Sequence, residues 1–176
     1  TYSLKKMKKE ERDIAMKPTQ FRIPGSNKMI DLRTLDETDE TVFNTIYYKE
    51  VPLVTGDMDE TVIVTYSPKY KKYQQKIRSR QIERAKKLLK NLDPETYKKG
   101  PHDVTRFIKR TSSTKSGETV TDKYALDLAA IEAEEKYDGF YAVATNLDDP
   151  AKDILEVSAN RYKIEDCFRV MKTNFS

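Results

Sequence analysis

The stretch DGFYAVATNLDDPAKDILEVSANRYKIEDCFRVMK, residues 138–172, decides the fold expected for this chain. Residues 140–145 form a short apolar run between turn-forming residues, a pattern that predicts a buried strand. The DDP sequence at residues 148–150 then supplies a helix N-cap and a proline at the first helical turn. We therefore expect a strand, a short loop and a helix that begins near Pro150 and continues to the end of the stretch.

That last helix carries charges at the border of its apolar face. At 100° per residue, Arg161, Glu165 and Lys172 project within about 40° of one another. Their strip overlaps the edge of an apolar stripe made of Ile154, Val157, Ile164, Phe168, Met171 and Phe175. An exposed helical ion pair contributes only a few tenths of a kcal/mol, so stability is a weak reason for this placement. The strip is either an ordinary solvated edge or the lining of a functional cleft.

The rest of the chain predicts a mixture of helices and antiparallel strands. Helical spacing of apolar residues alternates with β-branched and aromatic runs, and prolines and glycines separate these segments. The expected elements are a short surface helix (3–17), two paired strands (42–50 and 60–67), the longest helix (68–92), a second hairpin (105–111 with 119–127) and a short helix (128–137).

Composition limits the classes of protein to consider. A length of 176 residues with 37% hydrophobic residues fits one ordinary domain, or a domain that carries an insertion. No apolar run of about 18 residues exists, which excludes a membrane helix. With Cys167 as the single cysteine and His102 as the single histidine, neither an intrachain disulfide nor a structural zinc site is expected, and a reducing compartment fits. The start at Thr1 leads us to expect a fragment or a processed piece.

The long helix is strongly basic. Residues 69–90 contain ten lysines or arginines against a single acid, Glu83. Because DNA affinity arises from phosphate neutralisation, this helix is a candidate DNA contact; the candidate residues are Lys71, Lys72, Arg78, Arg80 and Arg84. Tyr66, Tyr70 and Tyr73 are candidates for stacking on an unpaired base. The alternatives are a solvated charged helix face and tyrosines that pack in the core.

The spacing Arg161-x3-Glu165-x6-Lys172, after a short apolar strand and a proline-started helix, resembles a known signature. It is similar to that of DDE transposases of bacterial insertion sequences, in the group marked by Tyr-x2-Arg-x3-Glu-x6-Lys. Ser158 occupies the position of the family's tyrosine. The resemblance is strongest over residues 137–175 and looser over residues 47–50, 62–85 and 107–112.

The resemblance implies an α+β fold with a partial ribonuclease-H-like core. Residues 1–17 and 137–176 would be core segments, and residues 18–136 an insertion with antiparallel strands and the long basic helix. Residues 1–6 would end a core strand that neighbours residues 138–146. Glu165 would be exposed at the end of the sheet, with the last helix packed against it.

The resemblance also implies chemistry. Such transposases hold two Mg²⁺ (or Mn²⁺) ions between three acids to cut and join DNA. Glu165 would be the third acid, a catalytic residue and metal ligand, while Arg161 and Lys172 would contact DNA phosphate and offset the local negative charge. The two catalytic aspartates would lie on strands before residue 1, and Asp127, Asp138 and Asp148 match loops of the family.

These implications define the expected behaviour. The chain alone should not cleave DNA and should hold no cofactor tightly. Its partners would be transposon-end and target DNA, with a dimer of the parent protein during transposition, no membrane, and a location in the bacterial cytoplasm at the nucleoid. The alternative is a stand-alone nucleic-acid-binding or scaffold domain in which Glu165 is only an ion-pair partner on open surface.

Overall fold

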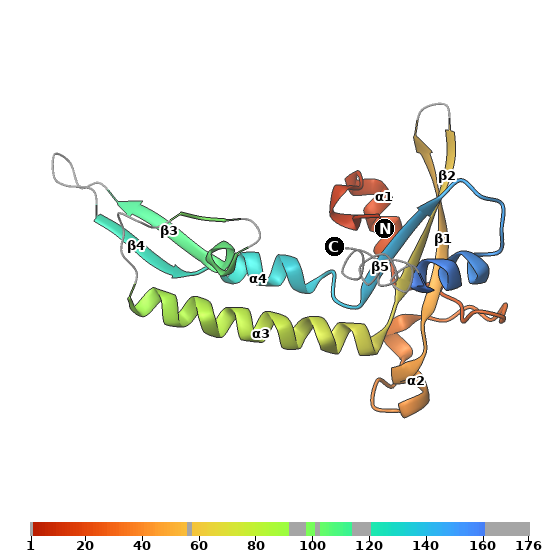
Figure 1. Cartoon of the computed structure of the whole chain (residues 1–176), viewed down its shortest axis with the longest axis horizontal. Coiled ribbons are helices and arrows are strands. Elements are labelled where there is room, and N and C mark those ends of the chain that lie inside the picture. Colours follow the sequence, from red (N-terminus) through yellow and green to blue (C-terminus); the bar gives the residue numbers. More distant parts are fainter. Residues whose placement is uncertain (1, 56–57, 92–97, 101–102, 114–120, 161–176) are drawn as a thin grey trace, which may run out of the picture. The chain divides into compact units, whose positions relative to one another are not determined.

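A computed structural model describes residues 2–55, 58–91, 98–100, 103–113 and 121–160 of the chain (Figure 1). The fold is α+β, with one three-stranded and one two-stranded antiparallel sheet. Contacts divide the chain into two compact units. The first unit comprises Thr1–Lys69 and Gly139–Ser176, and the second comprises Tyr70–Asp138.

The three-stranded sheet is the centre of the first unit. Its strands are β1 (Tyr47–Thr55), β2 (Met58–Tyr66) and β5 (Phe140–Thr145), in the order β1-β2-β5. Val62, Ile63 and Val64 are consecutive residues of β2, and each is at most 1% exposed. Because successive side chains point to opposite faces of a strand, both faces of β2 are covered. The predicted hairpin and the predicted strand at residues 140–145 are therefore confirmed.

The N-terminal segment reaches β5 at a single point. The backbone N–H of Tyr2 donates to the carbonyl oxygen of Ala142 at 2.8 Å, in an isolated antiparallel bridge. Directly afterwards the chain turns into a 3-10 helix, η1 (Leu4–Lys6), and then into α1 (Lys9–Met16). Of the strand expected beside β5, one residue, Tyr2, forms a bridge, Ser3 is extended, and Leu4–Lys6 are helical. Leu4 is buried in this arrangement.

The segment between α1 and β1 differs from the sequence-based prediction. A short helix, α2 (Glu40–Asn44), occupies residues that we expected to extend β1 toward the N-terminus. The cause is local, because the Asp39 carboxylate accepts hydrogen bonds from the backbone N–H groups of Thr41 and Val42 and caps that helix. A second 3-10 helix, η2 (Leu32–Thr34), is capped in the same way by Asp31. At its other end, β1 includes residues 51–55, which we had expected to form part of the loop between the two strands of the hairpin.

The second unit is built on the long helix predicted from sequence. α3 (Pro68–Lys90) begins at the proline, as expected, and the following elements are η3 (Val104–Phe107), β3 (Ile108–Ser113), β4 (Thr121–Leu126) and α4 (Leu128–Glu135). Its core consists of Ala85, Phe107, Ile108 and Ile131, all at most 8% exposed, with Ile82, Leu89, Tyr124 and Leu126 packed around them. Burying side chains such as Phe107 and Ile108 stabilises a fold by roughly 1.5–3 kcal/mol each.

The compact units divide the chain at other positions than the expected core and insertion. Residues 18–69 belong to the first unit, since β1 pairs with β2 and β2 pairs with β5. Whether residues 18–136 are an insertion into a larger core stays a prediction. Helical structure begins at residue 151 and continues through residue 160, in agreement with the expected start near Pro150. In the described part of the chain, no helix has the length and apolar character needed to cross a membrane.

Candidate nucleic-acid interface

The three motif residues of the last helix lie outside the described residues. Arg161, Glu165 and Lys172 all follow residue 160, the last described residue. His102 and Cys167 also lie outside the described ranges. What is described is the approach to the motif: β5 ends at Thr145, a loop follows, and residues 151–160 are helical. Ser158, at the family's tyrosine position, is half-buried in that helix. The catalytic and metal-binding assignments for Glu165 remain predictions.

α3 has two faces of opposite character. Arg78, Ile82, Ala85 and Leu89 are spaced by three or four residues, so they share the face that packs into the second unit's core. The opposite side of the helix carries the exposed charges. Of the five predicted DNA-binding residues, Lys72, Arg80 and Arg84 are exposed, Lys71 is half-buried, and Arg78 is buried.

The prediction that Arg78 lies on a DNA-binding surface is wrong, because its side chain is buried and paired with an acid. Arg78 is only 6% exposed and donates to both carboxylate oxygens of Asp138, with the Nη1 to Oδ1 distance at 2.8 Å. Asp138 is 8% exposed, and the Glu135 carboxylate lies 3.7 Å from Nε of Arg78. The hydrogen bonds that the Arg78 guanidinium donates to Asp138 raise its pKa. Arg78 therefore joins α3 to the end of α4 and does not present its charge to a ligand.

Two cations that we had not singled out take the place of Arg78. Lys76 and Lys87 are exposed and align with Arg80 and Arg84 along the solvent side of α3. Residues 76, 80, 84 and 87 follow one another at intervals of three or four, which places them in one row. We call Lys76, Arg80, Arg84 and Lys87 the α3 row. The sequence contains a signal for this difference. Arg78 falls on the same side of the helix as Ile82 and Ala85, whereas the α3 row falls on the opposite side.

The three tyrosines proposed for base stacking differ in exposure. Tyr66 is 6% exposed, and its hydroxyl donates to Oε1 of Glu37 at 2.5 Å, so its ring is a core ring and cannot stack on a base. Tyr70 and Tyr73 are 38% and 59% exposed, with ring centroids 6.3 Å apart and planes tilted by 20°. Only these two rings are placed on the surface of α3.

Charge is distributed unequally between the two units. Residues 70–138 contain 17 lysines or arginines against 11 acids, while the remaining residues contain 16 against 18. The small net charge of +4 thus hides a basic second unit. A concentration of positive charge in one unit is the electrostatic pattern of a nucleic-acid-binding protein.

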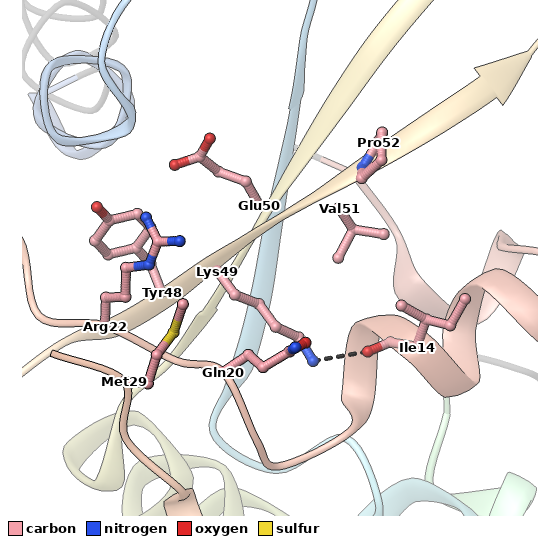
Figure 2. A pocket seen from close by; sticks show the side chains of 9 residues that line it. All are labelled: Ile14, Gln20, Arg22, Met29, Tyr48, Lys49, Glu50, Val51 and Pro52. Carbon is pink, nitrogen blue, oxygen red and sulfur yellow. Dashed lines mark hydrogen bonds between the residues drawn. The ribbon is translucent and has the colours of Figure 1, made fainter. Parts of the chain in front are cut away.

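The first unit contains a cavity of about 320 Å³ beside the edge of β1 (Figure 2). Exposed Ile14 and Met29 line it together with Lys49, which is 7% exposed. The Lys49 ammonium donates to the carbonyl oxygens of Ile14 at 2.7 Å and Lys17 at 2.6 Å, which satisfies carbonyls at the end of α1. Figure 2 shows Lys49 and Glu50 leaving β1 on opposite sides. The buried ammonium is thus a structural contact with the end of α1.

Burial should make stability depend on pH through Lys49. Desolvation, assisted by the charge of Lys17, lowers the pKa of the Lys49 ammonium from 10.5 to about 8. Between pH 8 and 10.5 the unfolded chain binds one more proton than the folded chain, so raising the pH favours the folded state. Relative to Lys49→Met, the wild-type chain should gain about 2 kcal/mol of unfolding free energy between pH 7.5 and 9.5, as measured by urea denaturation. An equal response of both chains to pH would contradict the assignment.

The described residues offer no ready metal site. Among them, no group of three or more His, Cys, Asp or Glu side chains is arranged to hold a metal ion. Asp127 instead caps α4 by accepting from the Ala130 N–H at 3.1 Å, and Asp138 pairs with Arg78. Asp148 is exposed after β5.

Comparison with known proteins identifies no relative. No protein family, no curated protein and no solved structure matches the chain. The function therefore has to be argued from the residues themselves.

Proposed function

We propose that this chain is part of the catalytic region of a DDE-type transposase. The observation that carries the proposal is the spacing Arg161-x3-Glu165-x6-Lys172 on the segment that follows β5, the loop and the helix at residues 151–160. In this proposal the first unit belongs to a ribonuclease-H-like core, and Glu165 is the third acidic ligand. The first two would come from residues outside this chain.

In the complete enzyme, Mg²⁺ or Mn²⁺ would activate the attacking oxygen and stabilise the leaving oxygen at a DNA phosphodiester. The residues of this chain would position the DNA. In the predicted helix, Arg161 and Lys172 would lie one turn before and about two turns after Glu165, where they could hold phosphate oxygens beside the carboxylate. The protein would act as a dimer on transposon ends and target DNA in the bacterial cytoplasm.

The DNA contact of the second unit is the α3 row. Its four cations span twelve residues, from Lys76 to Lys87, and the eleven helical rises between them cover about 16 Å. One strand of DNA presents a phosphate about every 3.4 Å along the duplex axis, so a row of this length faces several phosphates. Lys72 and the exposed rings of Tyr70 and Tyr73 extend the same helix surface toward its N-terminus.

A second candidate function is a nucleic-acid-binding domain without catalysis. It is favoured by the second unit's own core around Phe107 and Ile108 and by its excess of positive charge. Both candidates require DNA binding, and they differ in whether Glu165 takes part in cleavage.

The shared step is tested by the salt dependence of DNA binding. We expect the Lys76→Gln/Arg80→Gln/Arg84→Gln/Lys87→Gln chain to lose about 0.9 per lost phosphate contact from the slope of log K against log salt. The total change should be about 3 if most of the row contacts phosphate. Fluorescence anisotropy with a labelled 30-bp duplex measures the slope.

A matched control removes four exposed cations of the first unit, at Lys8, Lys9, Lys28 and Lys152. Its slope should stay close to that of the wild-type chain. Equal effects of the two quadruple variants would show that only net charge matters and would remove the α3 row from the proposal.

A further inference from the structure

The β3–β4 hairpin is a two-stranded ribbon with one packed face and one open face. Tyr124 and Leu126 of β4 and Ile108 of β3 pack on the second unit's core. In this register, Lys109 lies opposite Ala125 and Thr111 lies opposite Lys123. Because side chains alternate along a strand, these four residues project from the other face, and all four are exposed. We call Lys109, Thr111, Lys123 and Ala125 the ribbon face.

The ribbon face contains two like charges and no acid among its members. Lys109 and Lys123 are diagonal neighbours, which places their Cβ atoms about 7–8 Å apart. Both ammonium groups belong to the same face of the ribbon, so this face attracts a ligand of negative charge. The remaining two side chains are small, which leaves the backbone of the ribbon accessible between the lysines.

We infer that the ribbon face enters the major groove of double-stranded DNA and contacts base edges there. This inference rests on the proposed DNA-binding function and adds a site separate from the α3 row. The major groove is about 12 Å wide and accepts a two-stranded β-ribbon. Two paired strands lie about 4.8 Å apart, so the ribbon and its side chains fit that width.

The side chains of the ribbon face match the chemistry of the major groove. Lysine donates to the O6 and N7 acceptors of guanine, and a threonine hydroxyl contacts either kind of base pair. The methyl groups of threonine and alanine suit the methyl group of thymine. The distance between Lys109 and Lys123 is about the rise of two base pairs, so the two lysines would contact base pairs that are two positions apart along the duplex. The α3 row and the ribbon face point away from the second unit's core on opposite sides, so they would contact different stretches of DNA. The α3 row would hold phosphates, and the ribbon face would contact bases.

The experiment uses the whole chain and a pool of 30-bp duplexes with a randomised centre. Repeated selection by the wild-type chain should enrich a preferred sequence. Methylation of guanine N7, which lies in the major groove, should then weaken binding to the enriched duplex. Lys109→Gln/Lys123→Gln should bind that duplex about ten-fold or more weakly and lose the sensitivity to methylation. Thr111→Val, which keeps the side-chain shape and a strand-forming residue, should change the selected sequence.

A control variant, Lys98→Gln/Lys136→Gln, removes two exposed lysines of the second unit that lie outside the ribbon face. It should keep both the preference and the methylation effect, and circular dichroism should show that all variants are folded. Salt-dependent binding without any enriched sequence would overturn the ribbon inference and leave the α3 row intact. Absence of salt-dependent duplex binding would overturn both.

Discussion

Replacing Asp138 by alanine is expected to destabilise the second unit by about 3–5 kcal/mol. The reason is the burial of its partner, because Arg78 is 6% exposed and would remain charged without the carboxylate that accepts its two hydrogen bonds. Glu135 would be the nearest remaining acid, at 3.7 Å from Nε and half exposed to water. Urea denaturation followed by circular dichroism measures the loss.

The double variant Arg78→Met/Asp138→Leu separates a buried unpaired charge from a general loss of packing. Because both charged groups are replaced by apolar groups of similar size, its stability should return to within about 1–2 kcal/mol of wild type. Asp148→Ala provides a matched control, since Asp148 is an exposed acid after β5. If the double variant were as unstable as Asp138→Ala alone, the unpaired buried charge of Arg78 would not be the cause of the destabilisation.

Local patterns predicted the elements of the fold better than their pairing. Pro68 fixed the start of α3, and the β-branched residues of β2 predicted a strand whose centre is fully buried. Residues 40–44 form a helix because Asp39 caps their N–H groups, a local competition that strand-forming residues such as Val42 conceal. The pairing of β2 with β5 joins residues about 80 positions apart, and no periodicity in either strand contains that information.

In the candidate site, too, some features could be predicted from the sequence and others depend on the tertiary structure. The excess of positive charge on α3 is visible in the sequence, and so is the row from Lys76 to Lys87 once the apolar spacing is used to orient the helix. The pairing of Arg78 with Asp138 depends on where α4 ends relative to α3, which only the tertiary structure gives. Likewise, the hydroxyl of buried Tyr66 donates to Glu37, which is 29 positions away in the sequence. Charge counts therefore located the basic helix, whereas burial decided which of its cations face solvent.

The largest effect on activity is expected from Glu165→Gln in the full product of the gene that encodes this chain. A carboxylate is a strong ligand for a hard cation and an amide is a weak one of nearly the same shape. Loss of one ligand from a two-metal site should lower Mg²⁺-dependent strand cleavage by at least about 1,000-fold, equivalent to about 4 kcal/mol of transition-state stabilisation. DNA affinity should change little, because the α3 row is untouched. Gel analysis of cleaved transposon-end duplexes measures the rate.

Asp166→Asn is the matched control, since it removes a neighbouring carboxylate that, in the predicted helix, would project about 100° away from Glu165. It should retain most of the cleavage rate if the direction of the carboxylate, and not the local negative charge, determines catalysis. The 176-residue chain alone should show no cleavage, because one acid of the proposed three cannot hold two metal ions. Equal losses in Glu165→Gln and Asp166→Asn would indicate a general electrostatic effect. An unchanged rate in Glu165→Gln would favour the nucleic-acid-binding domain without catalysis, because the Arg161-x3-Glu165-x6-Lys172 spacing would then have no catalytic consequence.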